Sequence, residues 1–154
     1  MRELPHTHAC FVCGESNPAG LQLRFHTDGR VVRSVFNPRS EHAGFKGVVH
    51  GGILATVLDE IMVWACAVNA RKFGFCAEMT VRYHQPANPG EPLTATAELV
   101  ADRRGRVLEA SAALHNPAGV LVASATGKYM PIRDADLQEL KRDLVGDLEW
   151  LLPN

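Results

Sequence analysis

The stretch that decides the fold is GGILATVLDEIMVWACAVN, residues 51–69. It contains no proline, its two glycines stand at its start, and apolar side chains lie on nearly every side when it is drawn as an α-helix. A helix that is apolar all round is normally buried rather than laid on a surface. We therefore expect a central helix of about 27 Å, at about 1.5 Å per residue, enclosed by the rest of the chain.

The sequence after this helix predicts β-structure. Apolar and polar residues alternate in four segments of about ten residues, separated by turns that contain glycine, proline, asparagine or aspartate. Strands joined by short turns favour an antiparallel meander. The four predicted strands are residues 76–85, 93–100, 107–115 and 120–130.

The ends of the chain complete the predicted architecture. Residues 1–20 form an irregular arm with several glycines and prolines, and 21–131 form the folded domain. Two short strands, 21–25 and 31–36, precede the helix, and the C-terminal part, 132–154, forms an amphipathic helix over 134–152 with leucines on one stripe. We expect an α+β fold, with an antiparallel sheet wrapped around the central helix and the C-terminal helix packed on the same domain.

Composition excludes several classes of protein. The chain has 154 residues, the size of one domain, and a net charge of −1, so no basic excess is available to bind nucleic acid. Asp59 and Glu60 interrupt the longest apolar stretch, which argues against a membrane span. The first residues lack the apolar core of a signal peptide, so we expect a cytoplasmic protein with reduced cysteines. A chain this small has difficulty covering an apolar helix on all sides, so we expect at least a homodimer.

The start of the central helix is the strongest functional signal. The first backbone N–H groups of a helix lack internal partners and carry partial positive charge. Gly51 and Gly52 leave room for a ligand oxygen to approach these groups, an arrangement suited to a developing oxyanion. His50 stands just before them and offers a further hydrogen-bonding group.

Two carboxylates lie in the middle of the same helix. Asp59 and Glu60 are flanked by apolar residues, and carboxylates are rarely buried in such surroundings without a purpose. Asp59 shares a face with Thr56, which we expect to line a pocket, and Glu60 points about 100° away. Because Asp59 lies about 12 Å beyond Gly51 along one helix, a single carbonyl group cannot touch both in one chain. If both act on it, the site lies between two chains.

These residues resemble a known family. HGG at 50–52, with a carboxylate nine residues after the histidine, is similar to the hotdog-fold acyl-CoA thioesterases of the PaaI type (the phenylacetate-pathway branch). CFVCG and NPAGLQLRF, within residues 10–25, resemble one subgroup of that branch, and AEMTVRYHQP at 77–86 resembles its third strand. The resemblance covers about residues 10–130 and implies a hotdog fold, a homodimer or homotetramer, and hydrolysis of acyl-CoA without a metal or organic cofactor.

The resemblance also implies roles for individual residues. Asp59 is the general base or the nucleophile, the Gly51 amide of the partner chain polarises the carbonyl, and His50 positions the thioester. Glu60 is the reserve acid, because relatives use either carboxylate. Cys76 stands where some relatives have a Ser or Thr that orients water.

Basic loops suit the phosphates of CoA, and Arg103 and Arg104 lie in such a loop, where they are candidates for substrate binding together with Gly52, Thr56 and Cys76.

Two alternatives to hydrolysis remain open at this point. One is a non-catalytic acyl-CoA-binding protein, and the other is a hotdog hydratase or dehydratase acting on acyl thioesters, although the proline-rich motif of those enzymes is missing. Neither the acyl group nor the way in which dimers pair follows from the sequence.

A second cluster lies in the arm. His6, His8, Cys10 and Cys13 have a spacing that suits zinc, but no second CxxC or HxxxH pair follows. We therefore predict no metal there, with these four residues as the weak candidates, and expect a packed arm with two buried thiols.

Overall fold

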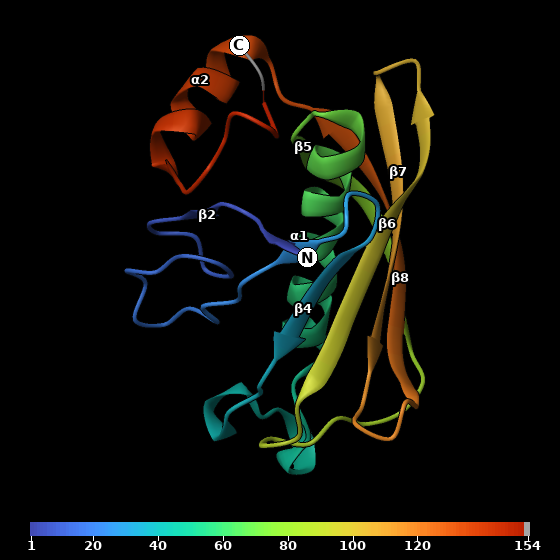
Figure 1. The fold of residues 1–154 in the computed structure, drawn as a ribbon. Coiled ribbons are helices and arrows are strands. Elements are labelled where there is room, and N and C mark those ends of the chain that lie inside the picture. The colour runs from blue at the N-terminus through green and yellow to red at the C-terminus, as the bar shows by residue number, and fades with distance from the viewer. Residues whose placement is uncertain (153–154) are drawn as a thin grey trace.

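A computed structural model describes residues 1–152 of the protein and confirms the predicted hotdog architecture. Helix α1 (Gly51–Ala70) lies against one face of a large antiparallel sheet, while the N-terminal arm and the C-terminal segment lie on its other side (Figure 1). Ten of its twenty residues are buried, and Leu58, Ile61, Met62 and Cys66 have no exposed surface. The predicted central helix therefore forms the core of the molecule.

Seven strands form this sheet, in the order β1-β3-β4-β6-β7-β8-β5, and all neighbouring strands are antiparallel. The alternation predicted for residues 107–115 is visible in the structure, where every second side chain is buried against the helix. The strands are β1 (Arg2–Glu3), β3 (His26–Thr27), β4 (Val32–Phe36), β5 (Gly74–Tyr83), β6 (Leu93–Arg103), β7 (Val107–His115) and β8 (Leu121–Pro131).

The predicted four-strand meander is wrong for its first strand. β6, β7 and β8 follow one another as predicted, but β5 pairs with β8 and lies at the edge of the sheet. The connection from β5 to β6 passes the start of α1, where the Val49 N–H donates a hydrogen bond of 2.8 Å to the Ala87 carbonyl. Alternation along a segment predicts a strand but does not say which neighbour it pairs with.

The strand predicted for residues 21–25 is also wrong. Leu23 and Phe25 are buried, as the alternation requires, but Gln22 has a φ of 53°, which breaks the extended backbone. The Leu21 and Leu23 N–H groups donate instead to the carbonyls of Phe11 and Val12 in the arm. The alternation thus predicted correctly which side chains are buried, but it did not show that the backbone of this segment pairs with the arm.

The C-terminal helix is shorter than predicted. α2 (Asp134–Asp143) is followed by β9 (Leu144–Val145), which pairs with β2 (His6–Thr7) of the arm. Gly146 then has a φ of 119°, a conformation that favours glycine and ends any helix. The later leucines therefore do not continue one helical stripe, although Leu151 is fully buried. The last two predicted residues, 153–154, lie outside the described part, and the division into arm, domain and tail stays a prediction.

By length and mean hydropathy (1.6), α1 is a helix that could also cross a membrane. Its side chains pack against five strands of the sheet, and the arm and the tail approach it from the other side. We therefore interpret it as the core helix of a folded domain.

The fold predicts a large cost for opening a cavity along α1. Leu58→Ala should lower the free energy of unfolding by about 2 to 5 kcal/mol, because Leu58 is fully buried. Val120→Ala, on a side chain that is 44% exposed, should change it by less than about 0.5 kcal/mol. Urea unfolding followed by circular dichroism measures both, and equal losses would contradict the central position of α1.

Candidate active site

His50 caps the start of α1. Its Nδ1 accepts a hydrogen bond of 2.8 Å from the Gly52 N–H, which satisfies one of the unpaired amides of the first turn. A neutral imidazole that accepts through Nδ1 carries its proton on Nε2. The exposed His50 ring therefore offers an N–H donor beside the helix start.

The Gly51 amide is left without such a partner. Among residues 1–152, no acceptor is within hydrogen-bond reach of this N–H group. The Gly51 carbonyl is fixed from the other side, because the Tyr83 hydroxyl donates to it at 2.7 Å. The helix start thus presents one oriented amide with the positive end of the helix dipole behind it.

The loop before α1 supports this arrangement. It contains two short 3-10 helices, η1 (Ser40–His42) and η2 (Phe45–Gly47). The His50 N–H donates to the carbonyl of the buried His42 at 2.8 Å. A Cβ at Gly44 would lie 3.1 Å from the His50 ring, so the absence of a side chain at residue 44 lets the loop pack closely against His50.

Asp59 lies near the sheet and is held by a tyrosine. The buried Tyr129 hydroxyl on β8 donates to the Asp59 carboxylate at 2.9 Å and lies 3.2 Å from the Asp59 carbonyl. Burial and the charge of Asp59 raise the pKa of Tyr129, so its hydroxyl stays protonated. Cys76 pairs with Tyr129 across β5 and β8, and partial burial followed by the Asp59 charge raises the pKa of its thiol. The structure thus brings Asp59, Tyr129 and Cys76 together.

The structure does not bring Asp59 together with Gly51 or His50 within one chain. α1 is one continuous helix from Gly51 to Ala70, so Asp59, eight positions after Gly51, still lies about 12 Å from it along the helix. The amide donor at the helix start and the Asp59 carboxylate are therefore two separate parts of the candidate site.

Glu60 points to the other side of the helix. Its carboxylate accepts a hydrogen bond of 3.2 Å from the Trp64 indole and lies 3.9 Å from the Cys10 sulfur in the arm. Burial, with a further contribution from Cys10, raises the pKa of Glu60 to about 7. The reserve acid thus faces the arm, whereas Asp59 faces Tyr129 and Cys76.

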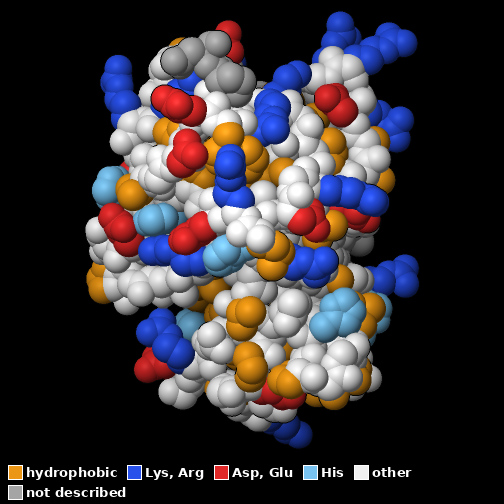
Figure 2. All heavy atoms as spheres, viewed as in Figure 1, with side chains coloured by type: hydrophobic (Ala, Val, Ile, Leu, Met, Phe, Trp, Pro, Cys, Tyr) orange, Lys and Arg blue, Asp and Glu red, His pale blue; other side chains and the backbone are white. Residues whose placement is uncertain are grey.

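The remaining predicted substrate residues are spread along the molecule. The Thr56 hydroxyl donates to the Gly52 carbonyl at 2.8 Å, so it is engaged within the helix. Arg103 forms a two-point ion pair with Glu109, with a shortest distance of 2.9 Å, and Arg104 is exposed in the turn between β6 and β7. Figure 2 shows Lys and Arg side chains gathered at the upper right, over this turn. The turn lies near the C-terminal end of α1, because Lys72 reaches the Gly105 carbonyl at 3.5 Å.

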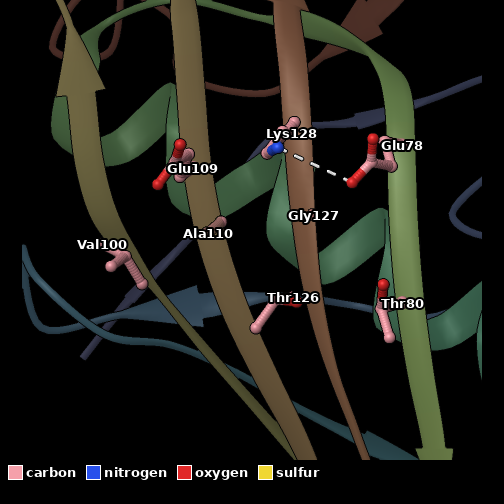
Figure 3. Close-up of a pocket in the computed structure, with 8 residues that line it drawn as sticks. All are labelled: Glu78, Thr80, Val100, Glu109, Ala110, Thr126, Gly127 and Lys128. Carbon is pink, nitrogen blue, oxygen red and sulfur yellow. Dashed lines mark ion pairs between the residues drawn. The ribbon is translucent and has the colours of Figure 1, made fainter.

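A shallow hollow of about 160 Å³ lies on the face of the sheet that points away from α1 (Figure 3). Glu78 and Lys128 form an ion pair of 3.7 Å across it, and Thr80, Thr126 and Glu109 also line it. Neither His50 nor Asp59 belongs to this hollow, so we do not place the reaction there.

Sequence reasoning missed Tyr83 and Tyr129. A signal for Tyr129 was present, because residues 123, 125, 127 and 129 alternate toward the core and a buried tyrosine needs a partner for its hydroxyl. The partner itself depends on which strand passes Asp59, and this was not visible in the sequence. Tyr83 lies at the end of β5 and is 54% exposed, so no comparable signal marked it.

The arm histidines do not join the arm cysteines. His6 and His8 both contact Glu15, at 2.9 and 3.1 Å. Within residues 1–152, the metal-binding atom that lies close to the Cys10 and Cys13 sulfurs is instead a carboxylate oxygen of Glu60. The four weak metal candidates of the sequence are therefore separated into two pairs.

Comparison with known proteins identifies the family of the chain. The family model described as the thioesterase superfamily matches residues 46–123, just over half of the chain, including the helix start and Asp59. Human acyl-coenzyme A thioesterase 13 is 35% identical over 69 residues, which cover 44% of this chain and 48% of that protein. The match thus spans about half the length of that curated relative.

Solved structures share the fold. A crystal structure of a thioesterase superfamily protein superposes with a TM-score of 0.73 and 29% identity, over 80% of this chain and 63% of that chain. The PaaI protein of the phenylacetic acid degradation operon of E. coli superposes with a TM-score of 0.66 and 20% identity, over 73% of this chain and 81% of that chain. With the family model matched across the helix and its site, the chain belongs to the thioesterase superfamily.

Proposed function

We propose that the protein hydrolyses the thioester bond of an acyl-CoA, with Asp59 as the base or nucleophile. The observation that carries this proposal is that one helix, on the segment that matches the family, presents both an oriented carboxylate and, at its start, an amide without a hydrogen-bond acceptor. Tyr129 donates to Asp59 and keeps the carboxylate in one orientation. The curated thioesterase relative and the shared fold support the same reaction class.

In the reaction, the carbonyl oxygen of the thioester accepts a hydrogen bond from the Gly51 N–H. This hydrogen bond stabilises the negative charge that develops on the oxygen. Asp59 either takes a proton from the attacking water or attacks the carbonyl carbon itself to form an anhydride that water then opens. In both routes the C–S bond breaks, one water is consumed to give the free carboxylic acid, and the CoA sulfur receives a proton. The His50 Nε2–H is a suitable donor near the thioester.

We further propose that two copies of the chain complete the site. β5 is a ten-residue strand at the edge of the sheet, and most of its side chains are exposed, including Phe75 (68%) and Tyr83 (54%). A long exposed edge strand with large apolar side chains is a natural surface for pairing. β5 also carries Cys76, beside Asp59, and Tyr83, beside Gly51, so a partner placed along it approaches both parts of the candidate site.

The proposal predicts a strong dependence on Asp59. Asp59→Asn should keep an acceptor for Tyr129, and hence the fold, but should lower acyl-CoA turnover at least about a hundredfold because the base is lost. Release of free thiol from a panel of short, medium, long and aromatic acyl-CoAs measures this. Glu98→Gln, which changes a charge on the exposed surface, is the control and should leave turnover unchanged.

Three outcomes would contradict this assignment. Equal turnover by wild type and Asp59→Asn would move the chemistry to Glu60. Tight binding of acyl-CoA without release of thiol by the wild type would favour the binding protein. Addition of water to an enoyl thioester, without hydrolysis, would favour the hydratase.

The role of the Gly51 amide has its own test. Proline is well tolerated at the first position of a helix and removes the N–H group there, and His50 already has the extended ψ of 132° that a following proline requires. Gly51→Pro should therefore lower turnover by about 10²- to 10³-fold, the usual effect of losing one oxyanion donor. Thiol release at saturating substrate measures it.

Gly51→Ala is the matched control. A Cβ at residue 51 would lie 3.2 Å from the Tyr83 ring, and alanine and proline both introduce this contact, but alanine keeps the N–H group. Equal losses in the two variants would mean that the crowding of Tyr83, and not the missing donor, causes the effect.

A further inference from the structure

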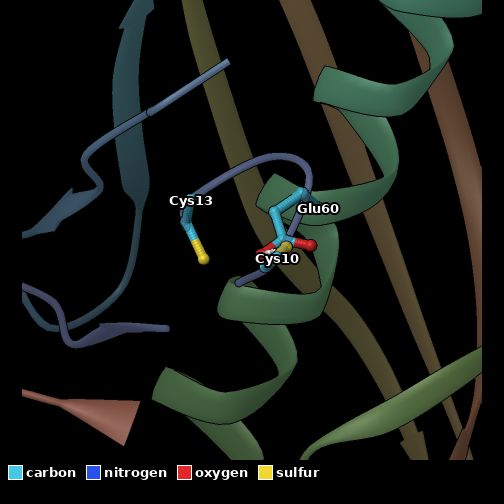
Figure 4. A group of neighbouring side chains, drawn as sticks. All are labelled: Cys10, Cys13 and Glu60. Atoms are coloured by element: carbon cyan, nitrogen blue, oxygen red, sulfur yellow. Dashed lines mark hydrogen bonds between the residues drawn. The ribbon is translucent and has the colours of Figure 1, made fainter. Parts of the chain in front are cut away.

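A buried cluster joins the N-terminal arm to α1 on the side away from the sheet. The sulfur atoms of Cys10 and Cys13 and a carboxylate oxygen of Glu60 all lie within 4.8 Å of one another. Figure 4 shows Glu60 projecting from the helix toward Cys10, with the Cys13 side chain pointing toward them from the other end of the arm turn. The reaction proposed above uses none of these three side chains.

The arm turn is shaped so that both sulfurs face the helix. The Val12 N–H donates to the Cys10 sulfur at 3.3 Å, and the Gly14 N–H donates to the Cys10 carbonyl at 2.8 Å. The next residue after Cys13 has to be glycine, because a Cβ at Gly14 would collide with the Cys10 carbonyl. Thr7 stabilises the turn, because its hydroxyl accepts a hydrogen bond of 3.1 Å from the Cys10 N–H. Amide donors to sulfur favour the thiolate, which is the form that binds metals.

The cluster gathers three acidic side chains, and the Arg24 guanidinium nearby donates to the Cys13 carbonyl at 3.0 Å rather than to any of them. Cys13 is fully buried, Cys10 is half-buried, and no Lys or Arg in residues 1–152 forms an ion pair with Glu60. Buried thiol and carboxyl groups are normally neutral, paired or bound to a metal, and metal binding is the state that holds all three as anions.

The distances suit zinc. Zinc–sulfur bonds of about 2.3 Å in a tetrahedral site place two sulfurs about 3.8 Å apart, so small side-chain rotations bring atoms already within 4.8 Å into range. Two thiolates select zinc or copper(I), and an added carboxylate oxygen favours the divalent ion. Three protein ligands leave a fourth position for water.

We propose that Cys10, Cys13 and Glu60 bind one Zn²⁺ ion, which fastens the arm to the central helix. On binding, the two thiols and any protonated Glu60 release their protons to solvent and the three groups become ligands. The Trp64 indole, which donates to a Glu60 oxygen, orients the carboxylate from outside the ligand set. Because Asp59 faces the sheet instead, this site is separate from the proposed catalytic residues.

The test uses the untagged full chain. Zn²⁺ is titrated in competition with a chromophoric chelator under reducing conditions, and Co²⁺ replaces it for absorption spectra. The wild type should bind about one equivalent and give the thiolate-to-cobalt charge-transfer bands of a tetrahedral site. Cys10→Ser/Cys13→Ser should lose both signals, and Glu60→Gln, which keeps the shape and the Trp64 bond, should weaken binding about tenfold or more.

Two controls isolate the site. Cys66→Ala removes a buried cysteine elsewhere on α1, and His8→Asn removes a histidine of the arm, and both should bind as the wild type does. Circular dichroism verifies that each variant is folded. If the double cysteine variant does not fold, the Glu60→Gln comparison alone decides.

Three results would overturn the proposal. One is Zn²⁺ binding by the wild type that is no tighter than that of the double cysteine variant. Another is Glu60→Gln binding with unchanged affinity, which removes Glu60 from the ligand set. The third is a Cys10–Cys13 disulfide in the protein as isolated that persists when reductant and Zn²⁺ are added together.

Discussion

The burial of α1 is the constraint on which the rest of the structure depends. A helix with apolar side chains on nearly every side has to be covered on every side, and one curved sheet covers only part of it. The arm and the C-terminal segment cover the opposite side, where Leu4, Val12 and Leu151 are buried. Pairing of the short strands β2 and β9 holds these two distant segments together. The irregular ends of the chain are thus part of the core.

The same constraint gives the two adjacent acids different environments. Asp59 and Glu60 differ by about 100° around the helix, so one faces the sheet and the other faces the arm. Asp59 meets a tyrosine hydroxyl and lies on the side of the exposed edge strand β5, where we propose that substrate and a second chain approach. Glu60 meets an indole and two cysteines in a closed place. These surroundings suit Asp59 to the proposed catalysis and Glu60 to the proposed metal site, although the two residues are neighbours on one helix.

Much of this organisation was predictable from the sequence, and the exceptions share one cause. The central helix follows from a long apolar run without proline, and the strand from Val32 and the three strands from Leu93 onward follow from alternation, because burial on one face imposes it. The partner of β5, the backbone of residues 21–25 and the end of α2 depend on contacts between distant segments. The candidate residues at the helix start follow from helix chemistry, whereas Tyr129 required knowledge of which strand passes Asp59. The grouping of Cys10 and Cys13 with Glu60, rather than with His6 and His8, likewise depends on where the arm packs.

The central claim is that Asp59 and the Gly51 amide act from different chains, and complementation between two inactive variants tests it most directly. Asp59→Asn and Gly51→Pro are co-expressed with different tags, and the mixed dimer is purified through both. Acyl-CoA turnover per dimer should recover to about half of the wild-type value, because one of the two shared sites is then intact. Turnover no greater than that of the parent variants, or failure to isolate a mixed dimer, would contradict a site built from two chains.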